Sequence, residues 1–122
     1  MRARLAELLG VRGPEPTRVV LAGFSQGAGV AGDVAVEEPR IGALASLSPC
    51  GFWLRQKLPQ RAGLRVFLAH GNHDAVCTVN ESRSLAAMLR DAHVPVQYLE
   101  FEGEHTVPNE VIRALVAWGA RY

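Results

Sequence analysis

Short apolar segments alternate with segments of helical periodicity along most of the chain. Residues 19–24, 41–47, 66–69 and 96–101 are apolar or β-branched, and Gly, Ser or Pro follows within two residues of each segment. Segments of this kind are typical of β-strands. Their near-continuous apolar character favours strands that are covered on both faces, as in a parallel sheet.

Segments with helical features lie around and between these strands. We expect helices over residues 4–9, 27–36, 52–58, 81–93 and 109–122, and Leu85, Met88 and Leu89 mark one face of the fourth. Because strands alternate with helices, the sequence predicts an α/β fold. The expected architecture is a three-layer α-β-α arrangement around a parallel four-stranded sheet, joined by right-handed crossovers.

Composition adds limits on size and partners. The length of 122 residues predicts one domain over residues 1–122, and 48% hydrophobic with 20% charged residues is typical of a globular protein with a core. The formal net charge is only +1, with both signs spread along the chain. This balance argues against nucleic acid or an anionic membrane as the partner and favours a small, nearly neutral substrate.

The apolar runs and the cysteines indicate where the protein is located in the cell and whether it binds a cofactor. No run reaches the ~20 apolar residues of a membrane span, and the start MRARLAELLG does not fit a signal peptide, so we expect a cytoplasmic protein. Cys50 and Cys77 lie far apart, without a C-x-x-C motif or a Cys/His cluster. We therefore expect two free thiols, and no metal or other cofactor.

Ser25 lies between two glycines, in the sequence GFSQG, where the first expected strand ends and a helix begins. Small neighbours allow a sharp strand-to-helix turn that exposes the serine hydroxyl, and the amide of Gln26 at the helix start would face an oxyanion. The motif has a second interpretation, in which the glycines only let the strand turn. A nucleophilic serine also needs a base and a residue that orients the base.

Two further residues with matching chemistry follow later strands. Asp74 lies in HGNHDAVCTV after the third expected strand, and His105 lies in EGEHTVPNE after the fourth. The carboxyl ends of parallel strands meet at one edge of a sheet, so we expect Ser25, Asp74 and His105 to lie together. Glu102 and Glu104 compete with Asp74 for the acid role, but residues so close to the histidine in sequence seldom reach its Nδ1.

At these residues the chain resembles the α/β-hydrolase family of serine hydrolases. More narrowly, the pieces GFSQGA, HGNHDAV and GEHTVP are similar to motifs of the phospholipase/carboxylesterase group, which includes the acyl-protein thioesterases. The resemblance implies that Ser25 is the nucleophile, His105 the general base and Asp74 the residue that orients it. It also implies that His70 is a structural residue.

The resemblance covers only part of the family's fold. The family has further strands ahead of the nucleophile strand, and a loop among them supplies the second oxyanion amide. We therefore expect this chain to correspond to the carboxyl-terminal half of an α/β-hydrolase. The strand Val19–Phe24 would then be a bare edge, and we expect it to pair with a missing amino-terminal half or with a second copy in a homo-oligomer.

The expected function is hydrolysis of carboxylic esters or thioesters through an acyl-serine intermediate. Trp53, together with Phe52, either lines an acyl pocket or belongs to the core. One alternative is a non-catalytic half-hydrolase that acts as a binding or assembly module and needs the missing amino-terminal half. Another is a related hydrolase that acts on a different bond, because the sequence does not separate ester, thioester, lactone and peptide substrates.

Overall fold

The computed structural model describes residues 19–121 of the chain. In order, these residues form strand β1 (Val19–Phe24), helix α2 (Gln26–Glu37), strand β2 (Ile41–Leu47), the 3-10 helix η2 (Arg55–Gln60), strand β3 (Arg65–Gly71), helix α3 (Val79–Asp91), strand β4 (Val96–Phe101) and helix α4 (Asn109–Ala120). The helix expected over residues 4–9 lies outside the described residues.

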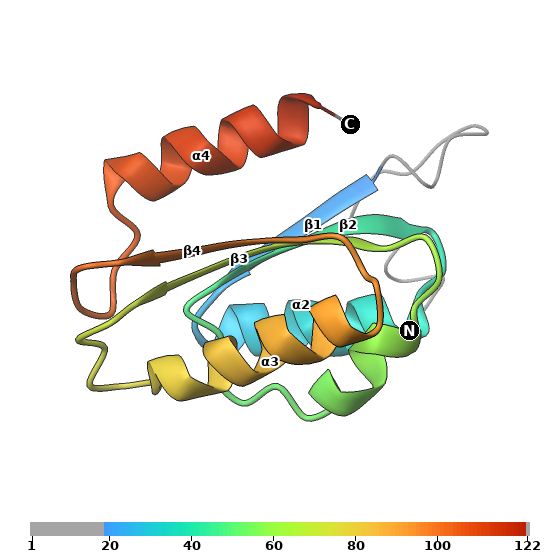
Figure 1. The fold of residues 1–122 in the computed structure, drawn as a ribbon, viewed down its shortest axis with the longest axis horizontal. Helices are drawn as coiled ribbons and strands as arrows, with labels where there is room; N and C mark the ends of the chain where they lie inside the picture. Colours follow the sequence, from blue (N-terminus) through green and yellow to red (C-terminus); the bar gives the residue numbers. More distant parts are fainter. Residues whose placement is uncertain (1–18, 122) are drawn as a thin grey trace.

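The sheet is parallel throughout, and its strand order β1-β2-β3-β4 follows the order along the chain. Helices α2 and α3 cover one face of the sheet, and α4 covers the other (Figure 1). Each face has its own apolar cluster: one is built around Leu44, Leu68 and Leu85, and the other around Phe67, Val111 and Trp118. The predicted three-layer α-β-α fold with a four-stranded parallel sheet is therefore confirmed.

How deeply each strand is buried depends on its position in the sheet. All residues of β2 are buried, and β3 is buried except for its first residue, as expected for central strands between two helical layers. Strand β1 was expected to be covered on both faces, but one of its faces is exposed in the described part of the chain, with Val20 42% and Phe24 40% exposed. The reason is that β1 lies at the edge of the sheet, whereas α4 packs on this face over β3.

Several elements differ from their expected bounds. Helix α2 extends one residue beyond the expected range at each end, α3 lies two residues earlier than expected, and α4 ends at Ala120. Strand β3 extends to Gly71, because its pairing with β4 continues through His70 opposite Glu100 and Gly71 opposite Phe101. The helix expected over residues 52–58 is a 3-10 helix that begins only at Arg55. Phe52 instead packs its ring into the core against α2, at a place where Gly32 leaves room.

The cysteines are joined in a disulfide between Cys50 and Cys77, with a Cα–Cα distance of 5.5 Å. The expectation of two free thiols is therefore wrong. The cysteines are separated by 27 positions in the sequence, which hides their proximity. They meet because Cys50 follows β2 and Cys77 follows β3, and these two strands are neighbours in the sheet.

Candidate active site

Ser25, Asp74 and His105 lie together beyond the carboxyl ends of three strands, in the loops after β1, β3 and β4. His105 Nε2 is 2.9 Å from Ser25 Oγ, and His105 Nδ1 is 2.7 Å from Asp74 Oδ2. Because a carboxylate only accepts, Nδ1 carries the hydrogen, and in the neutral ring the serine hydroxyl donates to Nε2. The three residues that the sequence singled out thus form one hydrogen-bonded chain.

Ser25 occupies a backbone conformation that side-chain-bearing residues rarely adopt, with φ 59° and ψ −124°. The turn is so tight that a Cβ on Gly23 would lie 2.3 Å from the carbonyl oxygen of Gly27. The Ser25 amide donates to the Leu47 carbonyl oxygen at 2.9 Å, which fixes the turn to the neighbouring strand. The conformation projects the hydroxyl at the start of α2.

The His105 loop is brought against the end of β3 by another glycine. A Cβ on Gly71 would lie 2.4 Å from the carbonyl oxygen of Glu104, the residue before His105. The imidazole ring also contacts the ring of Phe24, with 4.8 Å between the ring centroids. The histidine is therefore positioned from three sides, by Asp74, Ser25 and Phe24.

Asp74 has a fully buried side chain. Burial by itself raises the pKa of its carboxyl group, but hydrogen bonds from the Cys77 amide, His105 and the Val76 amide outweigh burial, so that this pKa lies below its ordinary value. The Cys77 and Val76 amides both donate to Oδ1, which leaves Oδ2 for His105. Asp74 is thus held as a carboxylate facing the imidazole.

His70 is a buried neighbour of this acid. Its Nε2 lies 2.7 Å from the carbonyl oxygen of Cys77 and 3.3 Å from Asp74 Oδ2, and its Nδ1 lies 2.6 Å from Ser82 Oγ. Since a carbonyl oxygen only accepts, Nε2 carries the hydrogen. His70 therefore connects β3, the Asp74 loop and α3, a packing arrangement in keeping with a structural role.

The other acidic and histidine residues of these loops lie apart from the chain of hydrogen bonds. His73 has a side chain that is 63% exposed and lies 3.7 Å from Glu102. Glu104 is exposed as well, and the acid that contacts His105 is Asp74.

Gln26 is the first residue of α2, so its amide has no acceptor within the helix. It borders a cavity of about 320 Å³ that is also lined by Val30, Asp33, Gly51 and Trp53. The Trp53 side chain is 87% exposed, whereas Phe52 is buried in the core. Of the two aromatic residues considered for an acyl pocket, only Trp53 borders this cavity.

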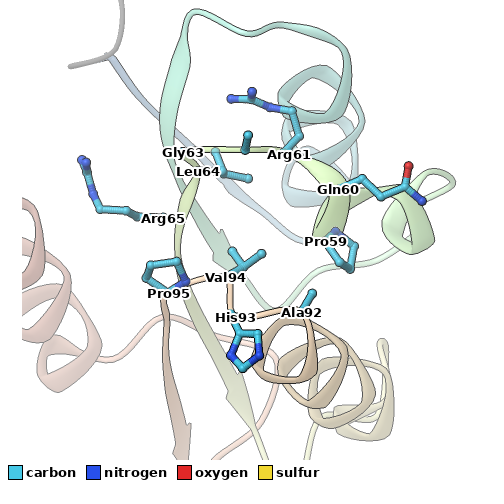
Figure 2. A pocket seen from close by; sticks show the side chains of 11 residues that line it. Pro59, Gln60, Arg61, Gly63, Leu64, Arg65, Ala92, His93, Val94 and Pro95 are labelled. Carbon is cyan, nitrogen blue, oxygen red and sulfur yellow. The ribbon is translucent and has the colours of Figure 1, made fainter.

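A second cavity, of about 450 Å³, lies at the opposite edge of the sheet. It is lined by the end of η2 and the start of β3 on one side and by His93, Val94 and Pro95 before β4 on the other (Figure 2). These residues lie at the amino-terminal ends of β3 and β4, whereas Ser25, Asp74 and His105 follow the carboxyl ends of their strands. This cavity is therefore separate from the site.

Sequence reasoning missed three features of the site: the Phe24 ring on His105, the contact of His70 with the Asp74 loop, and the disulfide. The position of Phe24 directly before the serine was the only local signal for any of them. The other two depend on which loops lie side by side. Within residues 19–121, no helix is long and apolar enough to cross a membrane.

Comparison with known proteins identifies the family to which this chain belongs. The sequence profile of the family described as serine hydrolase (FSH1) matches residues 4–112. The chain belongs to this family of serine hydrolases, and the resemblance to α/β-hydrolases is confirmed.

Individual relatives agree with this assignment. The chain is 29% identical to the putative hydrolase MhqD of Bacillus subtilis (strain 168) over 102 residues, which are 83% of this chain and 51% of that protein. It superposes on esterase PE8 with a TM-score of 0.78 at 25% identity, covering 98% of this chain and 55% of the esterase. Arabidopsis thaliana SOBER1 shares the fold, with a TM-score of 0.76 at 21% identity and coverage of 98% and 60%. The chain thus spans little more than half the length of these proteins.

Proposed function

We propose that this chain carries the catalytic residues of a serine hydrolase that cleaves carboxylic esters or thioesters through an acyl-serine intermediate. The observation that carries the proposal is the chain of hydrogen bonds from Ser25 Oγ through His105 to the buried carboxylate of Asp74. Membership of a serine hydrolase family and the similarity to an esterase support it.

In the proposed reaction, His105 Nε2 accepts the hydroxyl proton as Ser25 Oγ attacks the substrate carbonyl carbon. Asp74 keeps the imidazole in the required tautomer and stabilises the positive charge that develops on it. His105 then donates the proton to the leaving alcohol or thiol as the acyl-enzyme forms. Water, deprotonated by the same histidine, attacks the acyl-enzyme and releases the carboxylic acid.

The Gln26 amide is the proposed donor to the developing oxyanion, because it lies at the start of α2, where the helix dipole also favours negative charge. A second donor is expected from the part of the fold that the longer relatives have in addition. Loss of one oxyanion donor typically lowers turnover by ~10² to 10³-fold. The cavity beside Gln26, with Val30 and Trp53 in its wall, offers apolar surface for a substrate group.

Covalent labelling tests this proposal directly. The intact protein is treated with a fluorophosphonate, which reacts with activated serines, and the modified residue is located by mass spectrometry. We expect modification of Ser25 and none in Ser25→Ala. Ser84→Ala is the matched control, because Ser84 is exposed on α3 and away from the site, and it should label like the wild type.

The same proteins are then assayed with short and long acyl p-nitrophenyl esters and with acyl thioesters. We expect wild type and Ser84→Ala to hydrolyse at least one class, and Ser25→Ala to lose that activity. Equal labelling and equal hydrolysis in wild type and Ser25→Ala would remove Ser25 from the mechanism. A folded wild-type protein that is neither labelled nor active would favour the non-catalytic alternative.

A further inference from the structure

The Cys50–Cys77 disulfide joins the two turns that hold opposite ends of the hydrogen-bonded chain. Cys50 lies in the loop after β2, and its amide donates to the carbonyl oxygen of Ser25 at 3.1 Å. Cys77 lies in the loop after β3, and its amide donates to Asp74 Oδ1 at 2.8 Å. One covalent bond thus connects the backbone that contacts the nucleophile with the backbone that contacts the acid.

On the acid side, Cys77 is the principal anchor of its loop. Between residues 72 and 78, only Cys77 is buried as a whole residue, and Asp74 is the other residue with a buried side chain. The carbonyl oxygen of Cys77 accepts from His70 Nε2, and its amide donates to Asp74. A displacement of Cys77 would therefore disturb both of these contacts of the Asp74 loop.

On the nucleophile side, Cys50 is fixed against α2. A Cβ on Gly29 would lie 2.2 Å from the Cys50 carbonyl oxygen, so the loop and the helix are in direct backbone contact. Cys50 is therefore in direct backbone contact with Ser25 and with α2, and the disulfide attaches the more exposed Asp74 loop to this part of the fold.

We propose that the Cys50–Cys77 disulfide is a positioning cross-link, which sets the Asp74 loop relative to Ser25 so that reduction of the disulfide lowers turnover. This inference rests on the function proposed above. A dithiol supplies two electrons and two protons: the sulfur–sulfur bond breaks, two cysteine thiols form, and the dithiol becomes a cyclic disulfide. The chain has two cysteines in all, so this bond is the only one in it that a dithiol can reduce.

The pKa of Asp74 gives a readout that does not depend on catalysis. The Cys77 amide is the strongest of the hydrogen-bond donors that lower this pKa, and His105 and the Val76 amide add to its effect. Among residues 19–121, the titratable groups that face Asp74 are His105 from the loop after β4 and His70 from β3. Loosening of Cys77 should therefore raise the pKa of Asp74 towards its ordinary value.

The experiment compares the intact protein in its oxidised form, after reduction with dithiothreitol, and after reoxidation. Turnover of a p-nitrophenyl ester is measured together with the Asp74 pKa, by ¹³C NMR of its carboxyl carbon, and with circular dichroism to verify folding. We expect reduction to lower kcat by roughly 10- to 100-fold, as for small displacements of catalytic groups. KM should stay within about twofold, the Asp74 pKa should rise, and reoxidation should restore all three values.

Two variants separate positioning from stability. The double variant Cys50→Ser, Cys77→Ser should behave like the reduced protein and should not respond to the dithiol. If this variant does not fold, the double variant Cys50→Ala, Cys77→Val takes its place. Leu58→Ala removes a buried side chain from η2 and destabilises the protein with the disulfide intact. Below its melting temperature, Leu58→Ala should keep the kcat and the Asp74 pKa of the oxidised wild type.

A reduced or cysteine-free protein that stays folded and keeps both kcat and the Asp74 pKa would overturn the cross-link proposal. Failure of the proposed function is distinguishable from this result. In that case the oxidised protein itself is inactive and Ser25 is not labelled, while the response of the Asp74 pKa to reduction still reports on the cross-link.

Discussion

Asp74 accepts hydrogen bonds from three directions, which leaves its carboxylate little freedom to rotate. Two backbone amides hold Oδ1, and His105 holds Oδ2. Such an acid does more than supply charge, because its fixed orientation also selects the tautomer of the imidazole. An isosteric substitution of Asp74 should therefore distinguish the shape of the side chain from its effect on the imidazole tautomer.

Asp74→Asn should lower kcat by about 10⁴-fold, because an asparagine amide keeps the shape of the side chain but does not enforce the tautomer in which Nε2 accepts the Ser25 proton. Steady-state ester hydrolysis by the intact protein measures the effect. Glu102→Gln is the matched control, since Glu102 is 86% exposed and contacts His73 rather than His105. A loss of the same size in both variants would contradict the role of Asp74.

Glu100 offers a test of acid stability away from the site. Hydrogen bonds from Arg83 and Tyr98 lower the pKa of Glu100 to about 2. A carboxylate whose pKa is lower in the folded state contributes stability above its unfolded pKa, and this contribution is lost as the pH falls through the folded value. The contribution of Glu100 should therefore decline between about pH 4.5 and about pH 2.

Urea unfolding of wild type and Glu100→Gln across this range measures the contribution. We expect the free energy of unfolding to differ most at neutral pH, with wild type more stable, and to converge near pH 2. Parallel pH profiles for the two proteins would show that the ion pair with Arg83 has no effect on stability.

At the scale of elements, close backbone approach at the strand ends decides where the functional loops lie. The loop that carries His105 passes so near the end of β3 that no side chain fits at Gly71. The glycine therefore determines how far this loop lies from the loop that carries Asp74. Adding a methyl group at this position should lower both the stability and the activity of the protein.

Gly71→Ala should destabilise the protein by about 1 to 3 kcal/mol, the usual cost of overpacking, and should lower kcat because the His105 loop must move. Thermal unfolding and ester hydrolysis measure the two effects. Gly119→Ala provides the control, because space around Gly119 in α4 is open; the same change there should stabilise the protein by up to ~1 kcal/mol. Unchanged activity in Gly71→Ala would mean that the loop adapts without moving His105.

At the scale of the whole molecule, the disulfide closes a loop in the chain. The two cysteines follow neighbouring strands and are 27 positions apart in the sequence. Chain-entropy arguments give a stabilisation of about 3 to 4 kcal/mol for a loop of this length, because the cross-link restricts the unfolded chain. Reduction should lower the free energy of unfolding by this amount in urea titrations. The double Cys→Ser variant should show a similar loss and no further change with reductant.

Strand β1 pairs only with β2 among the described residues, and its outer edge carries backbone groups beside the exposed side chains of Val20 and Phe24. We propose that in the working protein this edge is covered by the further half of the fold that the relatives have. Hydrogen exchange of the Val19–Phe24 amides should then be slow, and light scattering should give the mass of one copy of the intact protein. Slow exchange with twice that mass would assign the edge to a second copy, and fast exchange in a monomer would contradict coverage altogether.

The sequence by itself determined the class of fold and the three residues of the candidate site. Apolar strand segments, helical periodicity and glycine-flanked turns are local properties, and parallel order then places every residue that follows a strand at one edge of the sheet. Ser25, Asp74 and His105 follow three different strands, so their meeting was predictable without coordinates.

Only the tertiary structure decided the contacts that depend on which loops are neighbours. The approach of Cys50 to Cys77 follows from the adjacency of β2 and β3, and the contact of His70 with the Asp74 loop follows from the extension of β3 to Gly71. Exposure of one face of β1 follows from its edge position, although its sequence is as apolar as that of a central strand. These features are non-local, and local sequence patterns carry no information about distances between segments that only folding brings together.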